Sequence, residues 1–385
     1  MRRLLVPSSA LLWGLQLAFL SPALALILVD LYGATTAEVG WILAVYNVSG
    51  FVAFLLFPAY ADRKRDYLGP MLACGVLTLV LAAVLAAVSS LPLATIALFV
   101  VGGPAGVGSS MLYAHLRHSG ARPTDVVNTR AIVSVAWVAG PPLATFIIGW
   151  FGNRAILLAI GAVAVLNIVT TMIMIKQRRA DRGAGDDRPA TAATDDGSPV
   201  SRAGIVLITA AFVLLQATNG TGMTILTVYV TQTVQLDVMW AGIALGIAAA
   251  LEVPALIVIG RLTERFSSLG LIVTSSLAGI AYYVGLALVT GPVTLIALQP
   301  LNAWCFAGIG GVGLTLFQQM IPRPGLSTGL YMNTRRIGSI VSGPIIAVGS
   351  LTAIGQRGIF VTCAVVTLIG VGIIAIARRT SSSAA

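Results

Sequence analysis

The 385-residue sequence has few charged residues: they make up 9% of the chain, whereas hydrophobic residues make up 57%. A soluble domain carries about 25% charged residues, so this scarcity excludes an ordinary soluble globular protein. It indicates a polytopic membrane protein that lives in a lipid bilayer.

Histidine and cysteine are also scarce, with two and three copies. Cys74, Cys305 and Cys363 lie in apolar stretches without a CxxC spacing, which argues against a disulfide framework or a metal site. The sequence has no HExxH motif, no clustered Ser and His, and no paired carboxylates within one apolar stretch. We therefore expect neither an enzyme nor a bound cofactor.

Apolar segments of membrane-spanning length fill most of the chain. A bilayer core of about 30 Å needs roughly 20 apolar residues per helix, and the rare charges cut the sequence into pieces of that size. Two longer uncharged runs, 66–117 and 265–323, hold turn signals at 89–92 and 290–292, so each predicts a helical hairpin. The single-crossing runs are 3–30, 38–62, 130–154, 154–176, 202–237, 237–261, 336–357 and 357–378. The sequence thus predicts an all-α membrane protein with twelve transmembrane helices.

Positive charges concentrate on one side of the predicted bilayer. The loops after odd-numbered helices hold only Asp30, Glu38, Arg154, Asp237 and Arg357, and nearly all other cations lie at the termini or after even-numbered helices. By the positive-inside rule both termini are cytoplasmic. The net charge of +10 therefore reflects topology and predicts no nucleic-acid partner.

The two halves of the chain repeat each other at an offset near 200 residues. The matching pairs are 62–63 with 264–265, 95–98 with 295–298, 128–130 with 333–335, and 152–154 with 355–357. Six crossings per half give both halves the same orientation, as in parallel-repeat transporters. The long polar segment between Lys176 and Arg202 cannot bury enough apolar surface to fold. We expect six-helix bundles at 1–176 and 203–385, joined by a cytoplasmic linker at 177–202.

Several stretches resemble a known transporter family. Pro58-Ala-Tyr-Ala-Asp-Arg63 and Gly260-Arg-Leu-Thr-Glu-Arg265 resemble the Gly-x-x-x-Asp-Arg loop motif of the major facilitator superfamily. Within it, the chain resembles the bacterial sugar efflux transporter (SET) family at 134–144, 250–254, 298–302, 310–318 and 330–336. Gly140-Pro141 also resembles the antiporter motif of exporters.

This resemblance implies the major facilitator fold, with two pseudo-symmetric six-helix bundles. It also implies a monomer in the bacterial inner membrane that exports small-molecule sugars or sugar-like compounds in exchange for protons, by alternating access. A multidrug/proton antiporter of the same fold is the alternative function. A membrane receptor or a membrane-embedded enzyme is a more distant alternative function.

Glu252 is the leading candidate for proton coupling. On a helix from Asp237 to Arg261 it lies roughly 13 Å from the inner end at 1.5 Å per residue, where a charged acid costs about 3 kcal/mol on insertion scales. Such an acid can bind a proton in one conformation and release it in another, or it can be a structural acid paired with arginine. Asp30, at the outer end of the first helix, is a weaker candidate, because an interfacial acid can face water.

Amide side chains inside predicted spans need hydrogen-bond partners. Sugars bind to amides beside aromatic faces such as that of Trp137, but bonds between helices, worth about 0.6 kcal/mol each, would also satisfy them. The resemblance implies that helices one, four, seven and ten line the substrate cavity. The candidate substrate-binding residues are therefore Gln16, Gln216, Asn219, Gln299 and Asn302, followed by Asn47, Asn333 and Trp137.

Arginines begin the repeated apolar segment in both halves, at Arg130 and at Arg335. They lie 24 and 22 residues before Arg154 and Arg357, or about 33 to 36 Å at helical rise, which places them at the inner edge of the membrane. Their side chains could snorkel to phosphates, contact sugar, or form a cytoplasmic latch.

In the latch, the loop acids of each half face arginines of the other. Arg335 or Arg336 would face Asp62, and Arg130 would face Glu264. Both pairs would form when the cavity opens outward and break when it opens inward. The predicted gating residues are Asp62, Arg63, Glu264, Arg265, Arg130, Arg335 and Arg336.

Overall fold

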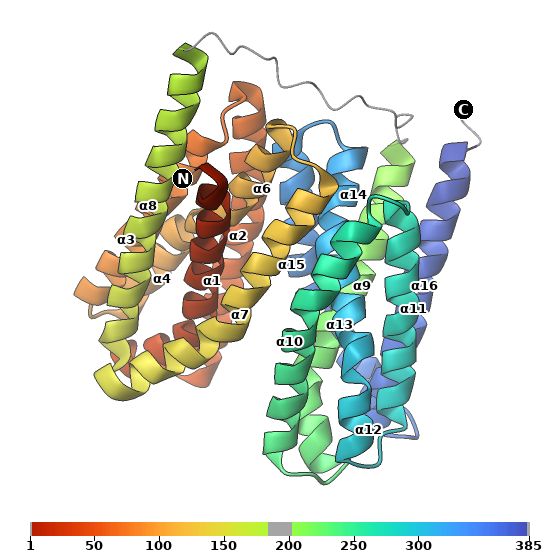
Figure 1. Cartoon of the computed structure of the whole chain (residues 1–385). Coiled ribbons are helices and arrows are strands. Elements are labelled where there is room, and N and C mark those ends of the chain that lie inside the picture. Colours follow the sequence, from red (N-terminus) through yellow and green to blue (C-terminus); the bar gives the residue numbers. More distant parts are fainter. Residues whose placement is uncertain (1, 184–201, 383–385) are drawn as a thin grey trace. The chain divides into compact units, whose positions relative to one another are not determined.

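The computed structural model describes residues 2–183 and 202–382, and its secondary structure in these ranges is helical (Figure 1). The first half contains α1 (Arg2–Tyr32), α2 (Thr36–Lys64), α3 (Leu68–Ala87), α4 (Leu91–Ala97), η1 (Leu98–Gly102), α5 (Gly103–Ala105), α6 (Gly108–His118), α7 (Pro123–Phe151) and α8 (Asn153–Gly183). The second contains α9 (Arg202–Gln232), α10 (Val238–Leu262), α11 (Ser268–Ala287), α12 (Pro292–Ala297), α13 (Gln299–Ala307), η2 (Gly308–Val312), α14 (Gly313–Met320), α15 (Pro324–Ser350) and α16 (Gln356–Ser382).

The helices fit the predicted membrane crossings. Among the described residues, ten segments are long and apolar enough to span a bilayer, and α1, bent by 45° between Leu20 and Ala23, would be the eleventh. The remaining expected crossing is α15, which is 27 residues long but contains Arg335 and Arg336 within a polar stretch. The predicted hairpin turns are also confirmed, since α3 ends at Ala87 before α4 begins at Leu91, and α11 ends at Ala287 before α12 begins at Pro292.

The predicted linker is described only at its two edges. Residues 184–201 lie outside the described residues, while α8 continues to Gly183 and α9 begins at Arg202. The expected boundary at residue 176 therefore falls inside α8.

Local sequence explains where several helices begin and end. Thr35 and Glu38 form a capping box at the start of α2, and the Asp237 carboxylate caps α10 by accepting from the Met239 N–H at 2.8 Å. Gly152 follows α7 with φ +82° and Gly355 follows α15 with φ +59°. Both need the left-handed backbone that glycine adopts without strain, and they occupy matching positions in the repeat.

Contacts between residues divide the chain into two units. The first consists of Met1–Ala121, Ile132–Thr194 and Arg323–Gly329, and the second of Arg122–Ala131, Asp195–Pro322 and Leu330–Ala385. Two short segments of these units depart from the order of the chain. The first residues of α7 belong to the second unit, and the first residues of α15 belong to the first unit.

Each unit repeats the packing of the other. In the first unit, the Tyr32 hydroxyl donates to the Leu85 carbonyl at 2.6 Å. In the second unit, the Tyr229 hydroxyl donates to the Leu286 carbonyl, also at 2.6 Å. These pairs are offset by about 200 residues, as the sequence repeat predicts.

Close helix crossings at small residues follow the same repeat. A Cβ on Gly14 of α1 would lie 2.7 Å from Cβ of Ala136 on α7, and one on Gly338 of α15 would lie 2.9 Å from the Ala217 nitrogen on α9. Both crossings leave no room for a larger side chain, as expected where membrane helices associate by packing.

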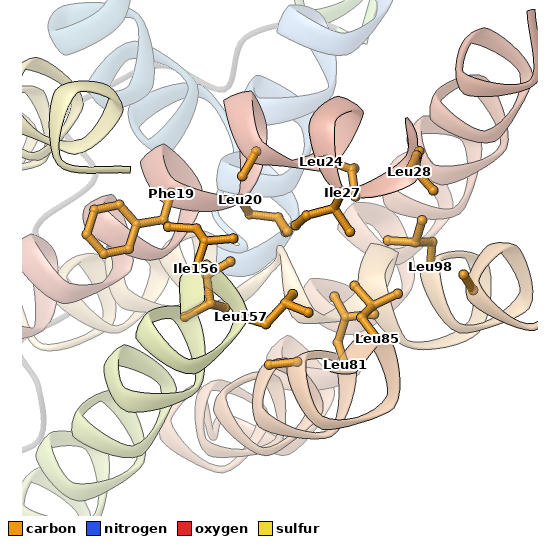
Figure 2. Close-up of a cluster of buried hydrophobic side chains, with 14 of the residues drawn as sticks. Phe19, Leu20, Leu24, Ile27, Leu28, Leu81, Leu85, Leu98, Ile156 and Leu157 are labelled. Atoms are coloured by element: carbon orange, nitrogen blue, oxygen red, sulfur yellow. The ribbon is translucent and has the colours of Figure 1, made fainter. Parts of the chain in front are cut away.

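A buried apolar cluster packs the C-terminal half of α1 against α3, η1 and α8 in the first unit. Figure 2 shows Leu20, Leu24 and Ile27 of α1 facing side chains of neighbouring helices. The cluster continues through Leu81 and Leu85 of α3, Leu98 of η1 and Leu157 of α8. This packing fixes the position of α1, whose middle carries the candidate Gln16.

Two π-helical segments, which the sequence did not predict, interrupt one membrane crossing in each half: η1 lies between α4 and α5, and η2 lies between α13 and α14. Leu98–Gly102 and Gly308–Val312 lie between the α-helical parts of these spans. A π-turn shifts the register of the side chains that follow it, and such turns are frequent at functional sites. The second one, η2, positions the charged residues described next.

Candidate functional site

Charged side chains gather around η2 in the second unit. Tyr331 of α15 donates its hydroxyl to the carbonyls of Ile309 and Gly310, at 3.0 Å each. Nε of Arg130, at the start of α7, lies 3.7 Å from where a Cβ of Gly310 would stand. Because Gly310 has no side chain, the guanidinium of Arg130 can lie close to its backbone.

Glu252 and Arg335 complete this group, which we call the charged cluster: Arg130, Glu252, Tyr331 and Arg335. Arg335 interacts electrostatically with Arg130, Tyr331 and Glu252, and also with its neighbour Arg336. Tyr331 interacts with both arginines and with Glu252. The cluster therefore joins an acid with two like-charged arginines, so that a change in the charge of Glu252 would alter the forces on both.

Glu252 lies within a membrane-spanning helix. It lies in the interior of α10, in a span bounded by Met239 and Leu262, and its side chain is half-buried. Arg335 is exposed and Arg130 is half-buried. Electrostatic contact with arginine is also what the structural alternative for Glu252, an acid paired with arginine, requires.

Amides of the second unit line a small cleft. Asn219 of α9 and Asn302 of α13 face it, together with the rings of Tyr282 and Tyr283, and its cavity volume is about 10 Å³. That is less than the ~300–1,000 Å³ of typical ligand pockets. The cleft nevertheless combines amides with aromatic faces, as a sugar contact requires.

Two further amides sit behind this cleft and the charged cluster. Gln299 is fully buried, donates to the Leu295 carbonyl at 2.8 Å and accepts from Asn302 at 3.3 Å. Gln216 is 8% exposed and hydrogen-bonds Tyr331. Gln299 orients Asn302, and Gln216 orients Tyr331.

In the first unit, the Gln16 side chain hydrogen-bonds residues of two neighbouring helices. It is 2% exposed, donates to the Thr78 hydroxyl at 2.7 Å and accepts from the Asn167 amide at 3.0 Å. These bonds tie α1 to α3 and α8. Its geometry is that of a bond between helices rather than of a group facing substrate.

Three other candidates are not among the residues that line the amide cleft. Asn47 is exposed and donates to the Leu43 carbonyl of its own helix, Trp137 of α7 is half-buried, and Asn333 of α15 is 1% exposed. Asp30 is exposed and accepts from the Asn153 amide at 2.6 Å, which ties the end of α1 to the start of α8. That contact fits the interfacial role for Asp30.

The expected partner of Asp62 requires correction. Its carboxylate accepts hydrogen bonds from the Gly325 N–H at 2.7 Å, the Leu326 N–H at 2.8 Å and the Tyr67 hydroxyl at 2.7 Å. The acid thus binds the N-terminus of α15, where free N–H groups favour an anion. Arg335 lies ten residues further along the helix, about 15 Å at helical rise, which is too far for the predicted ion pair with Asp62.

Glycines bring the start of α15 onto α2. A Cβ on Gly325 would lie 2.6 Å from the Pro58 carbonyl oxygen, and a Cβ on Gly329 would contact the Phe54 carbonyl oxygen. Only residues without a side chain permit this approach, which places the first N–H groups of α15 within reach of Asp62.

Glu264 also has a partner other than the predicted arginine. Its carboxylate accepts from the Thr124 hydroxyl, at the start of α7, at 2.9 Å. Arg130 lies six residues further along α7, beside η2. The arginines that follow the two acids, Arg63 and Arg265, are exposed. In this structure both predicted gating acids bind the starts of helices, α15 for Asp62 and α7 for Glu264.

Sequence reasoning missed several residues that complete these contacts. Asn167 is a buried amide inside a span, so the rule that selected Gln16 could have found it. Tyr67 and Thr124 carry no comparable signal, because a hydroxyl near a helix end is common.

Comparisons with known proteins agree with this architecture. The Major Facilitator Superfamily model matches residues 8–343. The chain is 28% identical over 348 residues to sugar efflux transporter B of Salmonella typhimurium, covering 89% of this chain and 87% of that protein. It is 32% identical over 217 residues to sugar efflux transporter A of Dickeya chrysanthemi, covering 56% and 54%. The solved structure of the E. coli fucose:proton symporter matches with a TM-score of 0.74 at 14% identity over 97% of each chain, a likeness of fold alone.

Proposed function

This chain belongs to the major facilitator superfamily, and from that premise we propose that it exports sugars or sugar-like compounds in exchange for protons. The observation that carries the sugar assignment is the similarity to sugar efflux transporter B over 89% of the chain. Members of this superfamily are transporters rather than enzymes. The amides and tyrosines of the second-unit cleft are suited to a polar substrate with hydroxyl groups.

We place the protein in the bacterial inner membrane as a monomer, with both termini in the cytoplasm. The charge asymmetry of the loops supports that orientation. On the same proposal the functional halves are 1–176 and 203–385, with 177–202 as the cytoplasmic linker.

Proton coupling would operate through the charged cluster. When Glu252 is ionised, it attracts Arg335 and offsets the repulsion between Arg335 and Arg130. When it binds a proton, that attraction is lost and the two arginines repel each other. A proton thereby changes the relative energies of two arrangements of α10, α15 and the start of α7, which is what exchange transport requires.

Alternating access would use the two helix starts as gates. The Asp62 bonds to Gly325 and Leu326, and the Glu264 bond to Thr124, would form in one state and break in the other. Because an anion at a helix N-terminus is stabilised by about 0.3–1 kcal/mol when exposed and more when partly buried, such contacts can bias the equilibrium without locking it.

Purified protein in liposomes tests the function directly. Vesicles carrying an imposed pH gradient are loaded with labelled mono- and disaccharides, and sugar release is compared with that from protein-free vesicles and from vesicles treated with a protonophore. We expect protein-dependent release of at least one sugar that the gradient accelerates and the protonophore abolishes. Gradient-driven transport of cationic dyes with no sugar flux would instead assign the chain to drug export.

A further inference from the structure

A basic groove lies within the second unit, between the start of α7 and the end of α10. Thr124 and Asn128 of α7 form one wall, and Arg261 of α10 and Arg265 of the following loop form the other. The groove has a cavity volume of about 590 Å³, far more than the amide cleft. Its size is sufficient for a molecule larger than an inorganic ion.

The charges in this groove favour an anion. Arg261 and Arg265 are four residues apart and exposed, and within the described part of the chain neither forms an ion pair. Glu264 also lines the groove, but its carboxylate is engaged by the Thr124 hydroxyl at 2.9 Å. Two guanidinium groups and one carboxylate leave the groove with an excess positive charge. Each guanidinium can donate two parallel hydrogen bonds to a pair of phosphate oxygens.

The groove is also amphipathic. Ile257, which lines it, is 41% exposed, and the adjacent Val258 is 46% exposed. Both belong to the apolar span Met239–Leu262, and the arginines follow directly where that span ends. A phospholipid has the same arrangement, with a phosphate at the membrane surface and acyl chains beneath it. A free phosphate ion would make no use of the apolar wall.

We propose that this groove binds the headgroup of an anionic phospholipid. The phosphodiester lies between Arg261 and Arg265, the headgroup hydroxyls face Asn128, and an acyl chain covers Ile257. A lipid held there contacts both α7 and α10, and so reinforces the bond between Thr124 and Glu264. Lipid binding in this groove requires neither a particular substrate nor a particular direction of transport.

Native mass spectrometry of the full chain in detergent measures this binding. The protein is titrated with phosphatidylglycerol and with phosphatidylcholine of the same acyl chains, and the bound fractions are compared. We expect tighter binding of phosphatidylglycerol, weakened about 30-fold by Arg261→Gln with Arg265→Gln, since each cation at an anionic membrane surface contributes about fivefold in affinity. The matched control removes two other exposed arginines, with Arg202→Gln and Arg323→Gln, and should change binding less than twofold.

Two further variants keep the test decisive if the double glutamine variant does not fold. Glu264→Gln keeps an acceptor for Thr124 but removes the competing negative charge, so it should bind phosphatidylglycerol about fivefold more tightly. Arg261→Lys with Arg265→Lys keeps the charge and should retain the preference for phosphatidylglycerol. Equal binding of both lipids, equal loss in the control variant, or full displacement by millimolar inorganic phosphate would each overturn the proposal.

Discussion

The Asp62 carboxylate accepts a 2.7 Å hydrogen bond from the backbone N–H of Gly325, 263 residues later in the chain. The same carboxylate binds the next N–H, of Leu326, so a side chain of the first loop motif caps a helix of the second half. The contact depends on an acceptor oxygen at Asp62 and on the absence of a side chain at Gly325, where a Cβ would lie 2.6 Å from the Pro58 carbonyl oxygen.

Removing the carboxylate should loosen the first turn of α15. Hydrogen bonds to charged groups contribute about 1.5–3 kcal/mol, so we expect Asp62→Ala to accelerate amide exchange at Gly325 and Leu326 about tenfold or more. Hydrogen-exchange mass spectrometry of the peptide around these residues measures it. Asp62→Asn, which keeps an acceptor, should have a smaller effect, and Arg63→Gln should have none. Unchanged exchange in Asp62→Ala would show that the cap contributes nothing.

Tyr67 gives this cap a dependence on alkaline pH. Burial, and then the hydrogen bond to Asp62, raises the pKa of the Tyr67 hydroxyl. The folded state therefore favours the neutral hydroxyl, so its contribution to stability is complete below the unfolded pKa of about 10 and declines as the pH rises towards the folded pKa.

Tyr67→Phe should lower the melting temperature at neutral pH, because it removes the bond to Asp62. It should also remove the part of the alkaline destabilisation that begins near pH 10. Melting temperatures of both proteins between pH 8 and 11 measure this. Parallel curves for the two proteins would rule out the tyrosine as the titrating group.

Asn302 should contribute to substrate affinity. It is half-buried beside the cleft and held by Gln299 at 3.3 Å. Loss of one sugar hydrogen bond costs about 0.5–1.5 kcal/mol, so we expect Asn302→Ala to raise KM for sugar efflux up to about tenfold, with kcat little changed. Gln319→Ala, on an exposed residue at the end of α14, is the control. An unchanged KM for Asn302→Ala would remove this residue from the substrate site.

Gln16 should affect stability and leave affinity unchanged, because both ends of its amide are bonded within the first unit. We expect Gln16→Leu and Asn167→Leu each to lower the melting temperature. The double variant should lose less than the sum, with a coupling of about 0.6 kcal/mol, as is typical of hydrogen bonds between membrane helices. A raised KM in Gln16→Leu, with normal stability, would restore its role in substrate binding.

Much of the fold could be predicted from the sequence because the bilayer imposes a length and a polarity on every crossing. Sparse charges such as Asp237 and Arg261 mark the ends of α10 within a few residues, and turn signals locate both hairpins. The duplication at Asp62 and Glu264 reappears as two acids that each bind the start of a helix from the other half.

The partners of these acids could not be predicted, because they depend on backbone rather than side chains. Nothing in the sequence states that Gly325 and Gly329 let α15 approach α2 closely enough to offer its N–H groups. The π-helical turn at Gly308–Val312 has no signal in the sequence either, and both Arg130 and Tyr331 approach Gly310 within it. The amides show the same limit: Gln16 and Asn302 look alike in sequence, yet one bridges helices and the other faces a cleft.

We propose that Glu252 carries the proton that drives sugar exit. Liposomes loaded with a labelled sugar that the protein transports are given an inward or an outward proton gradient, and release is compared for the wild type and Glu252→Gln. The account predicts that the variant still exchanges sugar at equal pH but no longer responds to the gradient. Sugar release that responds to the gradient equally in both proteins would contradict it.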